Sequence, residues 1–213
     1  NIRMKTEDKT VPFSVVNKIQ SFVAKQDPVL KLSKFKNFGP CLNYFLECLH
    51  WFQFLKKIVI NFNSFRQYMR ENQQGKAASK NFDIIQVLRQ RIITQNTIAE
   101  IEFRDRVPLN FKLLIDSIIK SHKYFHTAIF VDCDLNASQL NVLKQWIDTG
   151  TLEYLYLIST ISPINGPTFI ASLNNNYGAQ MLRKINISRL SRLEISSLIS
   201  YLPRIRYLSL QYC

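Results

Sequence analysis

The chain has little glycine and no long apolar run. Its five glycines, among 213 residues, are too far apart to form a loop that cradles a phosphate. They stand at Gly39, Gly75, Gly150, Gly166 and Gly178. No uninterrupted run of about 18 apolar residues occurs, so no membrane span is expected. The start of the chain also lacks the apolar stretch of a signal peptide.

Cysteine is equally scarce, and its spacing argues against two kinds of site. The four cysteines are Cys41, Cys48, Cys133 and Cys213, with no C-x-x-C pair and no histidine at ligand spacing. Metal binding is therefore not expected. Cys41 and Cys48 are seven residues apart, about 10 Å by helical rise, which is too far for a disulfide. Reduced, mostly buried thiols of an intracellular protein, cytoplasmic or nuclear, are expected.

Side chains suited to catalysis are few. The three histidines, His50, His122 and His126, stand in apolar or basic surroundings. Asp132 and Asp134 form the one close aspartate pair, which a solvated turn explains better than a metal or acid–base site. We therefore expect no enzyme activity and no cofactor.

One spacing of apolar residues recurs along the chain: apolar, two variable, apolar, one variable, apolar. Five clear copies are Leu55, Ile58, Ile60; Ile98, Ile101, Phe103; Leu152, Leu155, Leu157; Leu182, Ile185, Ile187; and Ile205, Leu208, Leu210. Phe125, Ala128 and Phe130 form a weaker copy, and Leu30 with Leu32 a degenerate one that has Asp27 at its first position. Each copy predicts a short strand, and the segments between them have helical spacing.

Successive copies begin 23 to 30 residues apart, except for one gap of 43 residues that starts at Leu55. This gap contains the polar stretch 70–80, which predicts an inserted loop within one long repeat. The pattern resembles a leucine-rich repeat, whose period is about 20–29 residues. It predicts an α/β solenoid with parallel strands on the concave face and helices on the convex face. The alternative is a set of unrelated strands in an ordinary α/β domain.

Two parts are predicted. Residues 1–26 form an N-terminal helix or cap, which ends at Asp27-Pro28 because the residue before proline is disfavoured in a helix. Residues 27–213 form six to seven leucine-rich-repeat-like units. The chain stops directly after a repeat strand without a polar closing element, so we expect the solenoid to be truncated within its repeats.

One block carries a further resemblance. Residues 132–147 combine a polar turn with a short helix that contains tryptophan, and the strand Leu152-Glu-Tyr-Leu-Tyr-Leu157 follows. This block resembles the F-box-associated repeat regions of nematode proteins. The resemblance implies the substrate receptor of a ubiquitin ligase, joined to a Skp-type adaptor through an F-box outside these 213 residues.

Acidic residues are outnumbered, with 15 against 28 lysines and arginines and a net charge of +13. The excess lies at both ends: +9 over residues 1–80, −1 over 81–153 and +5 over 154–213. The variable positions of each predicted strand face the concave side and form a candidate partner-binding site. Its residues are Lys56, Lys57, Glu100, Glu153, Tyr154, Tyr156, Arg183, Lys184, Arg206 and Tyr207.

This surface fits two kinds of ligand. Tyrosine beside arginine is favoured at protein interfaces, whereas the same residues can grip phosphates and stack on single-stranded bases. A solvated surface that binds nothing is the third possibility. We expect a protein ligand, because Glu100, Glu102 and Glu153 would repel a phosphate backbone that crosses the sheet. RNA or another single-stranded nucleic acid is the alternative, and no membrane partner is expected.

Overall fold

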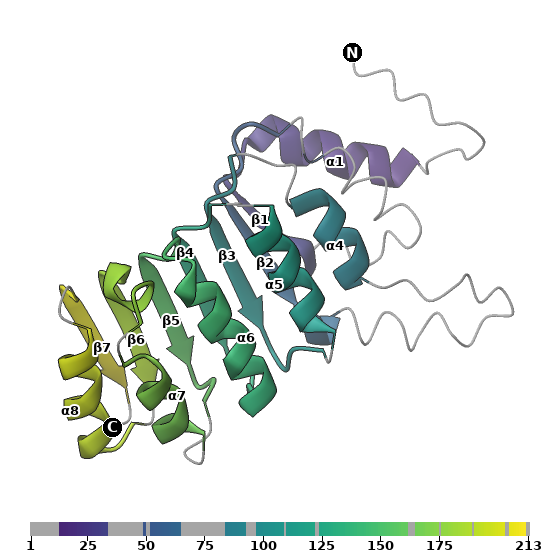
Figure 1. Cartoon of the computed structure of the whole chain (residues 1–213). Coiled ribbons are helices and arrows are strands. Elements are labelled where there is room, and N and C mark those ends of the chain that lie inside the picture. Colours follow the sequence, from purple (N-terminus) through teal and green to yellow (C-terminus); the bar gives the residue numbers. More distant parts are fainter. Residues whose placement is uncertain are drawn as a thin grey trace, which may run out of the picture.

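The computed structural model describes residues 13–33, 49, 52–64, 84–92, 97–108, 110–121, 124–161, 165–174, 176–188, 190–202 and 205–211. Within these residues, seven strands form one sheet in chain order, and every neighbouring pair is parallel (Figure 1). The strands are β1 (Val29–Lys31), β2 (Lys57–Asn61), β3 (Glu100–Arg104), β4 (Thr127–Val131), β5 (Tyr154–Ile158), β6 (Lys184–Ser188) and β7 (Tyr207–Gln211). The predicted α/β class with parallel strands is confirmed.

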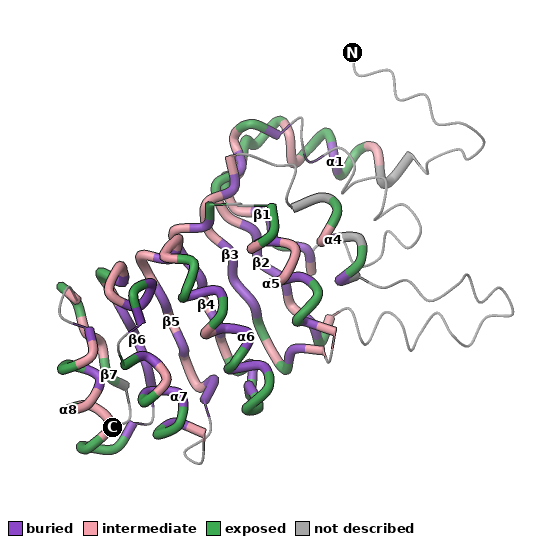
Figure 2. The backbone as a smooth tube through the Cα atoms, in the orientation of Figure 1, coloured by how far each residue is buried: buried purple, intermediate pink, exposed green. Residues whose placement is uncertain are grey.

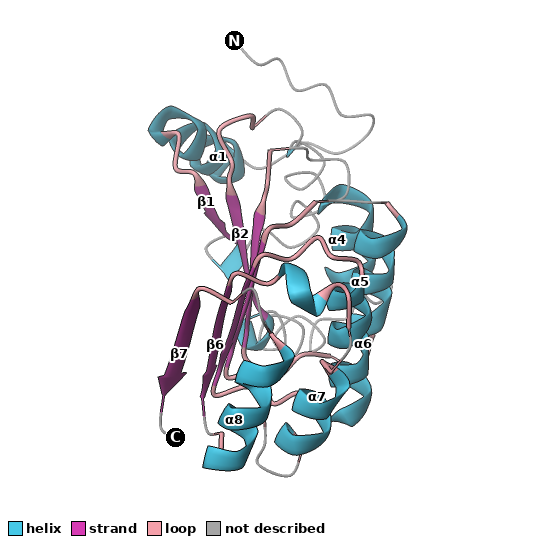
Figure 3. Ribbon diagram, turned by 60° about the vertical axis from the view of Figure 1, so that its left-hand side comes forward, coloured by secondary structure: helices cyan, strands magenta, loops and turns pink. Residues whose placement is uncertain are grey.

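The helices are α1 (Phe13–Lys25), α4 (Ile84–Ile92), α5 (Phe111–Lys120), α6 (Ala137–Asp148), α7 (Gly166–Ser172), the 3-10 helix η3 (Ala179–Met181) and α8 (Arg192–Tyr201). Helices α4 to α8 lie in a row on one face of the sheet, whereas α1 lies beyond the amino ends of β1 and β2 (Figure 3). We call the opposite face of the sheet the open face. A unit is a strand together with the residue directly before it and the segment that leads to the next unit.

The core lies between the sheet and this row of helices. The strand residues that point toward the helices are the apolar residues of the repeated pattern, and from β2 to β6 each is 0% exposed. Parallel pairing aligns them across the sheet, so that Ile101 lies beside Ala128, and Ala128 beside Leu155. The buried residues follow the strands and the inner sides of the helices (Figure 2). Burial of the weak copy, Phe125 with Ala128 and Phe130, is as complete as that of the clear copies.

Each unit begins with the same backbone contact. The carbonyl of Lys56 accepts hydrogen bonds from the next unit's Ala99 and Glu100 N–H groups, at 3.0 and 3.1 Å. The carbonyls of Ala99, His126, Glu153 and Arg183 each accept two N–H groups of the following unit in the same way. Equivalent positions in successive units therefore have equivalent bonds.

Each strand from β3 to β5 also ends in the same conformation. Asp105, Asp132 and Ser159 each stand two residues after the last apolar residue of a copy, and their φ angles are +64°, +54° and +49°. Aspartate is among the few non-glycine residues that adopt this left-handed region readily. The turn at the end of the strand is therefore a repeated feature of the chain.

A buried polar side chain then ties each of two units to the one before it. The Cys133 thiol donates to the carbonyl of Phe103 at 3.3 Å, and the Thr160 hydroxyl donates to the carbonyl of Phe130 at 3.0 Å. Both stand three residues after the last apolar residue of a copy. Burial raises the pKa of the Cys133 thiol to about 12, so the thiol keeps the proton that it donates.

Both ends of α6 are closed by local hydrogen bonds. Asn136 accepts the N–H of Gln139 at 3.0 Å, while the Gln139 side chain accepts the N–H of Asn136 at 3.0 Å, so both form a capping box. Gly150 has a φ of +69° and donates its N–H to the carbonyl of Ile147 at 2.9 Å, which closes the helix.

The first and last strands depart from the pattern. Strand β1 has three residues, and its neighbours Leu32 and Ser33 form a 3-10 turn. At the other end of the sheet, Leu210 of β7 is 36% exposed, and on α8 Leu193 is 82% exposed. The predicted loop at 70–80 lies outside the described residues, as do Cys41, Cys48 and Cys213.

Replacing Leu155 by alanine should lower the free energy of unfolding by about 2–5 kcal/mol, because it leaves a cavity in the fully buried core. Ile185→Ala should behave in the same way. The matched control is Leu193→Ala on the exposed side of α8, which should change stability by less than about 1 kcal/mol. Urea unfolding followed by circular dichroism measures all three, and equal losses would contradict the placement of the core.

Candidate functional site

The open face carries two rows of side chains that cross the strands, and a third row directly precedes them. The first row runs through Lys57, Glu100, Thr127, Tyr154, Lys184 and Tyr207. The second runs through Val59, Glu102, Ile129, Tyr156, Asn186 and Ser209. The third, at the amino edge, is Lys56, Ala99, His126, Glu153, Arg183 and Arg206. All ten residues of the predicted site belong to these rows.

A recess of about 550 Å³ lies over β1 to β3 on the open face. We call it the basic recess, and its lining residues are Asp27, Val29, Lys31, Ser33, Lys57, Val59, Asn61, Glu102 and Arg104. Glu102 is 5% exposed and lies in register between Val59 and Ile129. A buried carboxylate is costly unless it is paired, and this one has two cationic partners.

The partners of Glu102 come from its own strand and from β2. The Lys57 ammonium is 2.6 Å from Oε2 of Glu102, and Nε of Arg104 donates to Oε1. Burial raises the pKa of the Glu102 carboxyl, but the hydrogen bonds from Lys57 and Arg104 outweigh this effect and hold the pKa below its ordinary value. Glu102 is therefore ionised at neutral pH and fixes both cations beside the recess.

Aromatic side chains gather on the other half of the face, over β4 to β7. We call this group the tyrosine patch: Tyr124, His126, Tyr154, Tyr156 and Tyr207. The His126 ring lies 6.4 Å from the Tyr124 ring and 6.0 Å from the Tyr154 ring. Tyr124 and Tyr207 are 50% and 65% exposed. These rings present a large aromatic surface to solvent.

Cations flank the tyrosine patch. The Lys184 ammonium lies 5.2 Å from the centre of the Tyr156 ring, within the range of a cation–π interaction. Arg183 is 3.3 Å from the carboxylate of Glu153, which also accepts a hydrogen bond from the Tyr124 hydroxyl at 2.7 Å. This hydrogen bond raises the pKa of the Tyr124 phenol. Glu153, directly before β5, thereby links Tyr124, which precedes β4, to Arg183, which precedes β6.

The acidic residues are less of a barrier to anions than the sequence suggested. Glu102 is paired with Lys57 and Arg104, and Glu153 is paired with Arg183. The negative charge in the middle of the face is therefore largely compensated by cations of the same or the adjacent strand. Charge repulsion alone does not exclude a phosphate backbone.

Sequence reasoning missed Arg104, Asn61, Tyr124 and His126 as members of the site. Arg104 and Asn61 occupy the position after the last apolar residue of a copy, which lies on the same side as the two earlier variable positions because side chains alternate along a strand. His126 was visible as a variable position of the weak copy. Tyr124 precedes that copy, and no spacing marks it.

Asp132 and Asp134 lie in the turn after β4, and both are exposed with positive φ angles. This placement agrees with a solvated turn. Within the described residues, no group of three or more histidine, cysteine or acidic side chains is arranged to hold a metal ion. In the same residues, every helix is too short or too polar to cross a bilayer.

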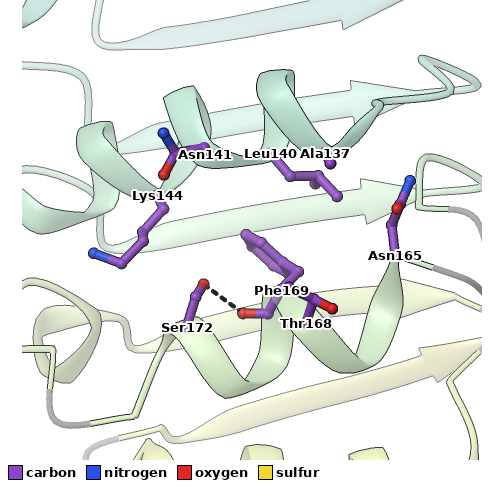
Figure 4. Close-up of a pocket in the computed structure, with 8 residues that line it drawn as sticks. All are labelled: Ala137, Leu140, Asn141, Lys144, Asn165, Thr168, Phe169 and Ser172. Atoms are coloured by element: carbon purple, nitrogen blue, oxygen red, sulfur yellow. Dashed lines mark hydrogen bonds between the residues drawn. The ribbon is translucent and has the colours of Figure 1, made fainter.

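A smaller hollow of about 150 Å³ lies on the helix side, between α6 and α7 (Figure 4). The Phe169 ring projects from α7 toward Leu140 of α6, and Asn141, Lys144 and Ser172 lie around them. Lys144 is already paired with Asp148 at 2.7 Å. This hollow is far smaller than the basic recess and lies on the other side of the sheet.

Comparison with protein-family models, with curated proteins and with solved structures found no match to this chain. Any function of the open face is therefore inferred from its own residues.

Glu102 should make stability depend on pH in the acid range. Its pKa in the folded protein is below the ordinary value of 4.5, so its contribution is fully present above that value and is lost as the pH falls through the folded-state pKa. Glu102→Gln should flatten the fall in unfolding free energy below about pH 5. Asp116→Asn, which breaks an exposed pair with Lys112, is the control and should leave the profile nearly unchanged. Identical profiles for wild type and Glu102→Gln would contradict the pairing.

Proposed function

We propose that the chain is a leucine-rich-repeat solenoid and that its open face is the concave surface of a non-catalytic module that binds a protein partner. Strand order supports the repeat, since each strand pairs only with its neighbours in the chain. Phe125, Ala128, Phe130, Cys133 and Leu135 also fit the longer leucine-rich-repeat motif, in which an asparagine or cysteine follows the strand.

Two observations support a concave open face. Neighbouring strands are about 4.8 Å apart, whereas packed helices need about 8–10 Å. A row of helices on one side of the sheet therefore makes that side convex and the open face concave. Val59, Glu102 and Asn186 of the second row are 7%, 5% and 8% exposed. Crowding by neighbouring side chains, which an inward-curving surface produces, explains this burial on a face opposite the helices.

The tyrosine patch is the observation on which partner binding rests. Tyrosines and arginines dominate the energetics of protein interfaces, because they bury a large area and still offer hydrogen-bonding groups. An exposed aromatic patch usually marks an interaction site, and Tyr124 and Tyr207 of this patch are at least half exposed.

A narrower proposal is that the module is the substrate receptor of a ubiquitin ligase. Its support is the resemblance of the block from Asp132 to Leu157, which spans the turn after β4, the helix α6 and most of β5. A Skp-type adaptor would then bind an F-box of the full-length protein. Recovery of that adaptor with the full-length chain, and its absence with residues 1–213 alone, is the expected result.

RNA is the second candidate, and the compensated carboxylates favour it. Lys57, Arg183, Lys184 and Arg206 would contact phosphates, and the tyrosines would stack on bases. We prefer a protein ligand because the exposed aromatic rings gather over β4 to β7, whereas Glu102 partly compensates Lys57 and Arg104 in the other half of the face.

Tyr154→Ala and Tyr207→Ala should each abolish capture of the same partner from the native cell. Against the purified partner, each should weaken binding by about 2 kcal/mol or more, as interface hot spots do. Tyr177→Ala is the matched control, since Tyr177 is 76% exposed in the connection before β6 and lies outside the patch. Calorimetry measures the affinities, and equal weakening by all three variants would contradict the proposal.

Removing Lys56 at the rim should change mainly the association rate.

A salt titration separates the two candidates. A protein that contacts several RNA phosphates loses affinity for RNA steeply as the salt concentration rises, because each neutralised phosphate releases counterions. We expect a shallow dependence for single-stranded RNA. A log–log slope steeper than about −4, lost in the Arg183→Ala/Lys184→Ala double variant, would favour nucleic acid over protein.

A further inference from the structure

We propose that the basic recess binds a carboxylate side chain of the protein partner. The partner then contributes an acidic segment, and another part of that segment lies on the tyrosine patch. This inference rests on the proposed function and specifies the chemistry of the ligand. It concerns the half of the open face that the tyrosine patch does not occupy.

The recess offers hydrogen-bond donors that the protein does not use. Arg104 donates through Nε to Glu102, and within the described residues its two terminal NH₂ groups have no protein acceptor. The Arg104 side chain is 51% exposed. Its free edge can therefore hold a carboxylate through two parallel hydrogen bonds.

The charge of the recess also selects an anion. Its cations are Lys31, Lys57 and Arg104, and its carboxylates are Asp27 and Glu102. Asp27 already accepts the N–H of Val29 at 2.9 Å. One positive charge therefore remains uncompensated, and an incoming carboxylate balances it, whereas a lysine or arginine of the partner would be repelled.

Glu102 supports this assignment because the fold alone does not require a carboxylate at its position. Its neighbours in the second row, Val59 and Ile129, are apolar, and an apolar residue between them would avoid the cost of burying a charge. A carboxylate here instead orients Lys57 and Arg104 from beneath. Glu102 is thus a positioning residue for the two cations.

Size and position fit a peptide. A volume of about 550 Å³ is within the usual range of binding sites and accommodates more than one side chain. Strands β3 and β5 are two strand spacings apart, about 10 Å. An extended peptide rises about 3.3 Å per residue, so a short segment reaches from the recess to Tyr154 and Tyr156.

The test uses a fluorescein-labelled peptide of six glutamates, with six glutamines as the uncharged control, and measures binding to the whole chain by fluorescence anisotropy. Arg104→Ala and Lys31→Ala should each weaken hexaglutamate binding, Arg104→Ala by at least about tenfold. Arg192→Ala removes the same charge from the exposed start of α8 and should change the affinity by less than about twofold. Equal weakening by Arg104→Ala and Arg192→Ala overturns the proposal, since general attraction to a basic protein would then explain the binding.

The variant Glu102→Gln distinguishes positioning of the cations by Glu102 from general attraction to a basic protein, because the two explanations predict opposite changes in affinity. It adds one unit of positive charge, so general attraction predicts tighter binding of hexaglutamate. Positioning predicts weaker binding, because Lys57 and Arg104 lose the carboxylate that orients them. Tighter binding overturns the proposal. Circular dichroism checks the fold of each variant, and Lys31→Ala, at an exposed site on β1, decides the matter if Glu102→Gln does not fold.

The recess and the proposed function can fail separately. If the tyrosine variants lose the partner while the recess variants bind hexaglutamate as wild type does, the recess proposal alone is overturned. If Arg104 and Lys31 govern hexaglutamate binding while the tyrosine variants keep the partner, partner binding through the patch alone is overturned.

Discussion

Parallel pairing in one fixed register is the constraint on which the rest of this structure depends. Side chains alternate along a strand, so a shift of one residue would turn every buried residue outward. The register places the apolar residues of β2 to β6 beneath the helices at 0% exposure. A parallel neighbour also requires a return crossing over the sheet, and the helices α4 to α8 of these crossings lie on one side (Figure 3). The opposite side of the sheet is the open face.

The sequence predicted the strands well because burial leaves little choice of residue. Ile58 and Ile60 lie in β2 and Leu55 lies two residues before it, and the weak copy that starts at Phe125 also forms a strand of five residues. Alternation then identified the first and second rows of the open face without any structure, although Arg104 and Asn61 were missed. Strand β1 was predicted too long, because the apolar residue Leu32 belongs to a turn rather than to a strand.

The interactions within the site were harder to predict, since they depend on distances that a pattern does not contain. The sequence showed Glu102 as one of several exposed acidic residues, whereas the structure buries it between two cations. Tyr124 contacts Glu153 from 29 residues away, and no periodicity connects them. The charge counted along the sequence therefore differs from the charge that the folded protein exposes on the open face.

The nearest-neighbour order of the strands has a mechanical consequence. From β2 to β6 each strand is bonded to the strand before it and the strand after it, and the contacts between units repeat from one junction to the next. Tension applied at the two ends of the chain would therefore detach units singly, beginning at a terminal unit such as that of β7, whose Leu210 is the least covered of the aligned apolar residues. The protein would lengthen in small steps under load, and the middle of the open face would keep its shape after the ends had opened.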